Sequence, residues 1–157
     1  MELFSKKIIR LFLGVAGLFV IDRASKWLAI NVLPEEGFFI IPDITGFILE
    51  RNQGIAYGIP LSPVFLIIIV SIIIFILFFL LVRAVQKHEL ESLAALSLII
   101  IGAFSNLLDR IRFEYVIDLM VLTSWPVFNL SDIFILAGVM WLIISYWQRQ
   151  RLLNKAK

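Results

Sequence analysis

Four long runs of apolar residues dominate the chain, and polar or charged residues separate them. The runs cover about residues 8–30, 63–82, 93–113 and 127–147. A helix needs about 20 mostly apolar residues to cross the hydrocarbon core of a membrane. The pattern therefore predicts an all-α membrane bundle of four transmembrane helices that forms one integral membrane domain, residues 1–157.

The segment between the first two runs, about residues 31–62, has a different pattern. Phe38–Ile41 and Gly46–Leu49 are short β-prone runs, and Pro42 and Gly54 interrupt them. Short apolar runs bounded by proline and glycine are typical of strands joined by turns. This segment is predicted to form a small β-sheet outside the membrane.

Composition supports a membrane protein and excludes several kinds of chemistry. Hydrophobic residues make up 61% of the chain and charged residues only 17%, whereas soluble domains are about a quarter charged. The absence of cysteine excludes disulfides, thiolate metal sites and a cysteine nucleophile. The single histidine, His88, lies among charged residues, so catalysis centred on histidine is not expected. A net charge of +2 is too small to indicate nucleic-acid binding.

The basic residues are distributed unevenly between the segments outside the four runs. Nine of them lie before or at the start of the first run, between the second and third, and after the fourth: Lys6, Lys7, Arg10, Arg83, Lys87, Arg149, Arg151, Lys155 and Lys157. The other two connections, together with the end of the third run, carry only Arg51, Arg110 and Arg112. Cytoplasmic segments of membrane proteins carry an excess of lysine and arginine. Both termini are therefore predicted to be cytoplasmic, and residues 31–62 are predicted to face outward.

The first run contains charged residues near its outer end. A charged side chain inside a span costs about 2.5–3.5 kcal/mol on insertion scales. Asp22 and Lys26 are four residues apart, so they share a helix face and can form an ion pair. This pair could serve the function or only neutralise itself against a neighbouring helix. Arg23 and Ser25 are expected to point away from that face, and the long side chain of Arg23 could extend outward from the membrane.

The third run also ends in polar residues. Asn106 and Arg110 are four residues apart and share a helix face, and Asp109 lies beside it. Gly102 lies one turn earlier, where a small residue permits close packing of helices. Because Asn106, Asp109 and Arg110 form a cluster, ordinary interfacial charge is a poor explanation for all three.

Asp118 and Asp132 are the candidate catalytic residues. The third and fourth runs should be antiparallel neighbours, so the two carboxylates can meet at the outer side of the membrane. Two close carboxyl groups cannot both ionise easily, because repulsion and desolvation raise a pKa. One can then take a proton from water while the other polarises a peptide carbonyl, as in aspartic proteases.

Two alternatives remain open at this point. Carboxylates inside a membrane also serve small transporters, and a similar chain could be an inactive homologue that only binds a membrane partner. A transporter should have polar residues through the full depth of the bundle. Here the second run contains no charged residue and the charged and amide groups lie at one level, which argues against transport.

Four motifs in order resemble the bacterial lipoprotein signal peptidase family, also called signal peptidase II. Asp22, Ser25 and Lys26 match its first motif, and Asn52-Gln53-Gly54-Ile55-Ala56-Tyr57 resembles an Asn-x-Gly-x-Ala-Phe motif. Asn106 to Arg110 with Val116-Ile117-Asp118 resembles the third motif. Phe128-Asn129-Leu130-Ser131-Asp132 resembles the fourth, usually Phe-Asn-x-Ala-Asp.

The resemblance implies an aspartic endopeptidase of the bacterial inner membrane that acts near its outer face. It would remove signal peptides from diacylglyceryl-modified prolipoproteins, on the N-terminal side of the modified cysteine. The partners would be this substrate and membrane lipid, with no metal, cofactor or nucleic acid, and the chain is expected to be a monomer. Asp118 and Asp132 would be catalytic. The supporting or substrate-binding residues would be Asp22, Lys26, Asn52, Gly54, Asn106, Asp109, Arg110 and Asn129.

The chain departs from the family pattern at five positions. Tyr57 replaces the usual Phe, Ser105 replaces a Gly, Glu114 falls near a usual Gly, Leu119 replaces a Phe and Ser131 replaces an Ala. None of these changes affects the two aspartates. They are expected to bear on substrate fit and efficiency more than on the type of reaction.

Overall fold

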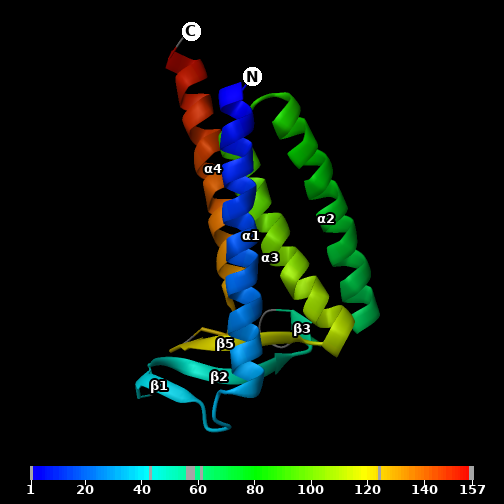
Figure 1. Cartoon of the computed structure of the whole chain (residues 1–157), viewed down its shortest axis with the longest axis vertical. Coiled ribbons are helices and arrows are strands. Elements are labelled where there is room, and N and C mark those ends of the chain that lie inside the picture. The colour runs from blue at the N-terminus through cyan, green and yellow to red at the C-terminus, as the bar shows by residue number, and fades with distance from the viewer. Residues whose placement is uncertain (1, 43, 56–58, 61, 124, 156–157) are drawn as a thin grey trace.

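The computed structural model describes residues 2–42, 44–55, 59–60, 62–123 and 125–155. This part of the chain forms four helices: α1 (Glu2–Asn31), α2 (Pro63–Gln86), α3 (Leu90–Phe113) and α4 (Leu130–Lys155). The helices form a bundle, and the two ends of the chain lie together at one end of it (Figure 1). Each helix contains most or all of one predicted apolar run, so the helical part of the prediction is confirmed.

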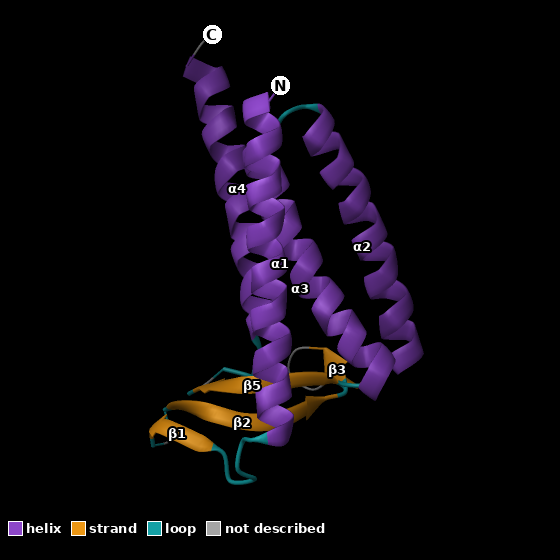
Figure 2. Ribbon diagram, in the orientation of Figure 1, coloured by secondary structure: helices purple, strands orange, loops and turns teal. Residues whose placement is uncertain are grey.

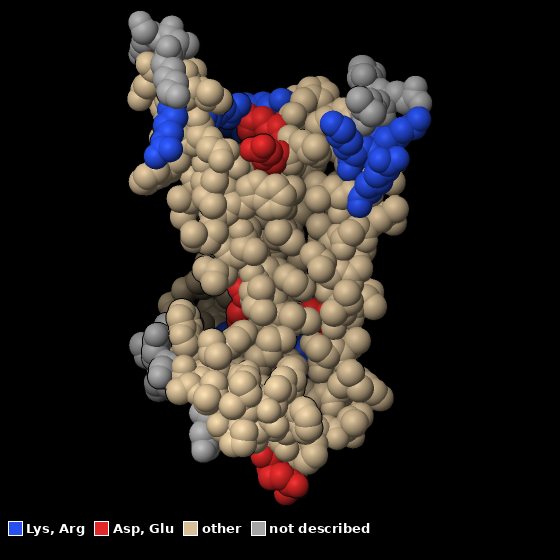
Figure 3. Space-filling model, turned by 90° about the vertical axis from the view of Figure 1, so that its left-hand side faces the viewer, with Lys and Arg blue, Asp and Glu red and all other residues tan. Residues whose placement is uncertain are grey.

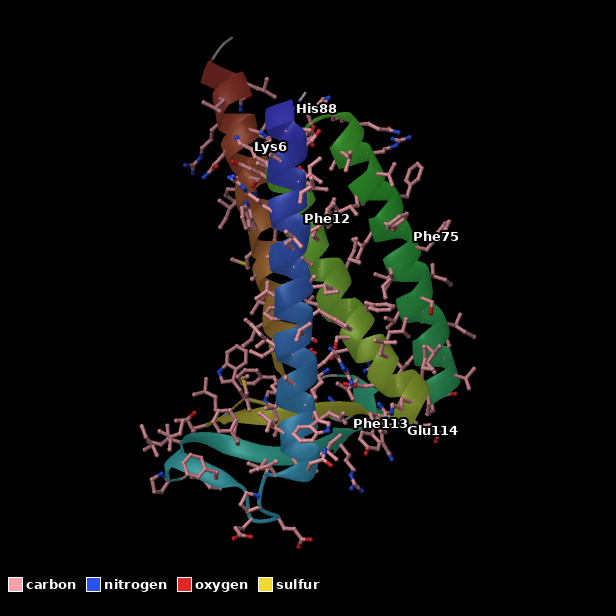
Figure 4. All side chains as sticks on the ribbon, viewed as in Figure 1. Lys6, Phe12, Phe75, His88, Phe113 and Glu114 are labelled. Atoms are coloured by element: carbon pink, nitrogen blue, oxygen red, sulfur yellow. The ribbon has the colours of Figure 1, made fainter. Side chains whose placement is uncertain are left out.

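Three of the helices are long and apolar enough to cross a membrane: α2, α3 and residues Leu130–Asn154 of α4. On α2, Phe75 is 75% exposed and points away from the other helices (Figure 4). The helix α1 has sufficient length, but Asp22, Arg23 and Lys26 interrupt its apolar run. The fourth span therefore stays a prediction.

A small sheet closes the end of the bundle opposite the termini (Figure 2). It is antiparallel, in the order β1 (Phe38–Ile41), β2 (Thr45–Asn52), β5 (Val116–Leu122). A second pair joins β3 (Gly54–Ile55) to β4 (Ile59–Pro60). The sequence predicted a sheet from residues 31–62, and β5 adds to it a strand from outside that segment.

The pairing of β2 with β5 fixes the position of Asp118. Glu50 lies opposite Asp118 and Asn52 lies opposite Val116, so Asn52 and Asp118 are neighbours on adjacent strands. Buried Ile117 and Leu119 point the other way and pack with Ala29 at the end of α1. Because side chains alternate along a strand, packing of these two apolar residues turns Asp118 toward the bundle.

Close packing of α3 on α4 brings their outer ends together. A Cβ atom on Gly138 would lie 2.6 Å from the carbonyl oxygen of Ala95 and 2.6 Å from Ile99 Cγ1, and one on Gly102 would overlap the carbonyl oxygen of Ser131. Only glycine permits this approach of two helix backbones. The packing role predicted for Gly102 is confirmed, and it sets the end of α3 against the start of α4.

Candidate active site

Asp118 lies on β5 with only 2% of its surface exposed. Its carboxylate accepts two hydrogen bonds from amides: Asn52 Nδ2 lies 2.8 Å from Oδ2, and Asn129 Nδ2 lies 2.6 Å from Oδ1. Burial raises the pKa of this carboxyl group from 3.8 to about 6. The two amides oppose that rise, and the negative charge of Asp132 adds to it. Asp118 can therefore hold a proton at a pH where most carboxyl groups are ionised.

Asp132 lies in the first turn of α4 and also accepts two N–H groups. Asn106 Nδ2 lies 2.8 Å from its Oδ1, and the backbone nitrogen of Asn129 lies 3.1 Å from its Oδ2. In return, the Asp132 backbone N–H donates to Asn129 Oδ1 at 3.1 Å. This reciprocal pair is a capping box, which satisfies free N–H groups at a helix start. The hydrogen bonds that begin α4 thus also hold the carboxylate.

Each of the three asparagine side chains has its amide orientation fixed by a donor on its oxygen. The oxygen of Asn52 accepts the Gly54 N–H at 3.1 Å, and that of Asn129 accepts the Asp132 N–H. The oxygen of Asn106 accepts the Lys26 ammonium at 2.8 Å and Asn129 Nδ2 at 3.2 Å. Because an amide presents a donor on one side and an acceptor on the other, all three NH₂ groups must face a carboxylate.

Both carboxylates line one cavity of about 590 Å³ near the sheet. In the space-filling view, acidic and basic residues are visible inside a hollow in a band that otherwise shows no charged residues (Figure 3). Arg110 also lines the cavity, and its Nη2 donates to the Gly54 carbonyl at 3.1 Å. The rest of the lining is mainly apolar: Val116, Leu122, Trp125, Pro126, Val127, Phe128, Ile133 and Leu136. Such a site suits a mostly apolar ligand with one polar group at the carboxylates.

A buried charge cluster lies beside the amides and joins α1 to α3. Lys26 Nζ lies 2.7 Å from Asp109 Oδ2 and 3.6 Å from Asp22 Oδ2, so the predicted ion pair between Asp22 and Lys26 is confirmed. Arg23 Nη1 lies 2.5 Å from Asp109 Oδ1, and the Ser105 hydroxyl donates to Asp22 Oδ2 at 2.5 Å. The four charges balance within the cluster, which offsets the cost of burial.

The buried charge cluster beside the site contains two residues, Arg23 and Ser105, that the sequence did not identify as members of it. Arg23 could have extended outward from the membrane, but in the structure its guanidinium contacts Ser105 and Asp109 on α3. Ser105 entered the analysis only as a departure from a family pattern. Helical spacing could have identified Ser105, because Ser105 and Asp109 are four residues apart and so share one face of α3.

The structure gives physical reasons for some of the departures. Glu114 has a φ of 66° at the end of α3, a conformation that glycine adopts most readily. Leu119 fills part of the apolar cluster under α1. The Ser131 N–H donates to Asp22 Oδ1 at 2.9 Å, while its hydroxyl has no partner among the described residues. Tyr57 lies outside the described residues.

In the described part of the chain, the single histidine lies far from this site, and no group of side chains is arranged as metal ligands would be. His88 lies at the end of the bundle opposite Phe113 and Glu114 (Figure 4), with its ring 4.4 Å from that of Phe4. Within the described ranges no three His, Cys, Asp or Glu side chains gather as metal ligands would.

The sequence of this chain is similar to that of known proteins over most of its length. The family model described as signal peptidase (SPase) II matches residues 15–148. The lipoprotein signal peptidase of Halothermothrix orenii is 30% identical over 89% of this chain and 97% of its own length. That of Moorella thermoacetica is 33% identical over 82% and 84%.

Solved structures agree with the sequence relatives. A bacterial membrane enzyme solved at 2.3 Å superposes with a TM-score of 0.80 and 26% identity, over 91% of this chain and 90% of its own. A second, solved at 1.9 Å, has a TM-score of 0.75 and 27% identity. The chain belongs to the signal peptidase II family of lipoprotein signal peptidases, and it is therefore a membrane aspartic peptidase.

Proposed function

We propose that this enzyme cleaves diacylglyceryl-modified prolipoproteins on the N-terminal side of the modified cysteine, with Asp118 and Asp132 as the catalytic pair. The observation that carries the proposal is a pair of carboxylates, Asp118 buried and Asp132 half-buried, each held by two N–H donors at one mainly apolar cavity. Asn52, Gly54, Asn106, Arg110 and Asn129 position the pair or the substrate, and Asp22, Lys26 and Asp109 support the site.

Two carboxyl groups that share a proton can carry out hydrolysis without a covalent intermediate. The ionised one takes a proton from water as the water oxygen attacks the scissile carbonyl carbon. The protonated one gives its proton to the carbonyl oxygen. Collapse of the tetrahedral intermediate then breaks the C–N bond, and the amine leaves with a proton from the pair. The two groups titrate as one unit, so neither role is assigned to one residue.

The proposed setting is the bacterial inner membrane, with one domain, residues 1–157, acting as a monomer. The four helices would span the membrane with both termini in the cytoplasm and the carboxylates toward the outer face. Polar partners inside the bundle for Asp22, Arg23 and Lys26 support α1 as the fourth span. A substrate anchored by two acyl chains would then reach the cavity from the lipid, and the peptide would meet the carboxylates near the surface.

Dependence on the lipid tests this substrate. The purified enzyme in liposomes is given a prolipoprotein with a diacylglyceryl cysteine and, in parallel, the same protein with an unmodified cysteine. We expect cleavage of the first at least about 100-fold faster, because acyl chains buried in lipid or in the apolar cavity supply binding energy at about 0.8 kcal/mol per CH₂. Mass spectrometry should find the modified cysteine at the new N-terminus. Equal cleavage of both proteins, or a cut elsewhere, would count against the proposal.

The raised pKa of Asp118 predicts a pH profile. Because its carboxyl group keeps a proton up to about pH 6, the shared proton is present below that pH and is lost above it. We expect kcat/KM, which reports the free enzyme, to fall as the pH rises through about 6. The measurement is initial cleavage rates from pH 4 to 9 at low substrate concentration. A kcat/KM that rises steadily across this range would contradict the assigned protonation.

A further inference from the structure

Lys26 is the residue of the buried charge cluster that contacts an amide of the site. Its side chain is fully buried. The ammonium donates to Asp109 Oδ2 at 2.7 Å and to Asn106 Oδ1 at 2.8 Å. An ammonium has three donor hydrogens and no acceptor, so its neighbours can present only acceptor atoms to it.

This requirement determines which way Asn106 faces. With its oxygen on Lys26, the amide directs Nδ2 at Asp132 Oδ1, 2.8 Å away. If the amide turned over, its NH₂ group would meet the ammonium, and its oxygen would meet a carboxylate oxygen. Both hydrogen bonds would be replaced by repulsive contacts. Asn129 Nδ2, at 3.2 Å from Asn106 Oδ1, favours the same orientation more weakly because it is neutral and farther away.

Charge balance in the cluster does not by itself require the contact with Asn106. Asp22 already accepts the Ser105 hydroxyl and the Ser131 N–H. Asp109 already has Arg23 at 2.5 Å. Arg23 is thus a second cation in the same cluster, but its hydrogen bonds go to Ser105 and Asp109 and not to an asparagine of the site.

We propose that Lys26 is a positioning residue for the peptidase reaction, because its ammonium fixes the Asn106 amide and so directs an N–H group at Asp132. The inference rests on the proposed function, since Asp132 matters here as a catalytic carboxylate. It assigns Lys26 a task beyond pairing with Asp22. Without Lys26 the amide can turn over, and Asp132 loses one of its two donors for part of the time.

The first test compares Lys26→Met with the matched variant Arg23→Met. Each removes one cation from Asp109 and keeps an unbranched apolar side chain. We expect Lys26→Met to lower kcat about 100-fold, the scale of a misplaced reacting group, with KM nearly unchanged. Arg23→Met should keep kcat within about twofold of wild type, although it lowers the thermal stability. Equal losses of kcat in both variants would contradict the inference.

A charge-balanced variant separates positioning from folding. Lys26→Met leaves a buried carboxylate without its partner, which can destabilise the protein by itself. Lys26→Met with Asp109→Asn removes one charge of each sign and leaves Arg23 and Asp22, which both form hydrogen bonds with Ser105. We expect this pair of changes to restore most of the thermal stability but not kcat. Restored kcat, or a protein that still fails to fold, would assign Lys26 to the fold alone and overturn the inference.

A double-mutant cycle with Asn106→Ala shows whether the effect passes through the amide. In the Asn106→Ala background there is no amide to orient, so Lys26→Met should lower kcat by no more than about twofold further. Additive losses would overturn the inference. A wild-type enzyme that cleaves no prolipoprotein would instead refute the proposed function, and the two failures are therefore distinguishable.

Discussion

Replacement of either Asp118 or Asp132 by asparagine should reduce kcat on the order of 10⁴-fold, the upper range for loss of a general acid or base. Asparagine keeps the shape of aspartate, but it can neither hold a negative charge nor exchange the proton. At position 118 the new NH₂ group would also face an amide donor, Asn52 or Asn129. The measurement is cleavage of the lipid-modified prolipoprotein in liposomes, with thermal unfolding as a check on the fold.

Glu114→Gln is the matched control for these two variants. This exposed carboxylate lies four residues before Asp118, at the end of α3 and outside the cavity. It undergoes the same change of acid to amide, so its activity should stay within about twofold of wild type. Turnover by either aspartate variant at the level of this control would refute the catalytic pair and would favour a binding role for the site.

Asn129→Ala should also lower activity strongly, because this one side chain serves three partners. It donates to Asp118 at 2.6 Å and to Asn106 at 3.2 Å, and it accepts the Asp132 N–H that begins α4. We expect kcat to fall about 100-fold through misplaced carboxylates. The lost helix cap should also lower the free energy of unfolding by about 1 kcal/mol. Kinetics and thermal unfolding of the same preparation measure the two effects.

Two further variants separate the cap from the amide donor. Asn129→Asp keeps an oxygen that can cap the helix, but it places a third carboxylate at a fully buried position beside Asp118. Activity should therefore fall further, and the free energy of unfolding should not return to the wild-type value. Asn31→Ala removes an exposed amide at the end of α1, where Nδ2 donates to the Trp27 carbonyl, and it should change neither quantity appreciably. Activity of Asn129→Asp close to wild type would show that the amide donor is dispensable.

Long-range pairing explains which parts of the fold the sequence could predict. The apolar runs predict helices because a membrane requires continuous apolar length, and all four appear. The strand β5 was missed because its residues, Val116–Leu122, are mainly apolar and give no alternation of their own. It becomes a strand by pairing with β2, which lies more than 60 residues earlier in the chain.

The sequence could also predict only part of the candidate site, namely its residue types and not their orientations. The motifs contain Asn52, Asn106 and Asn129, because family resemblance preserves residue types at fixed spacing. No spacing reveals which way an amide faces, since that depends on donors from other segments, such as Lys26 on Asn106. The contacts of Arg23 were not predicted because a helix taken alone shows only its own faces, and the partner that draws Arg23 inward, Asp109, belongs to α3.

The hydrogen-bond network around the two carboxylates can be completed only after the last helix, α4, has been synthesised. The groups around the two carboxylates come from α1, β2, α3, β5 and the start of α4. Synthesis proceeds from the N-terminus, so Asn129 and Asp132 emerge last. Until α4 packs against α3, Asp118 lacks one of its two donors and Asp132 lacks its position. A nascent or truncated chain without α4 would therefore be unable to cleave other proteins of the same membrane during its own assembly.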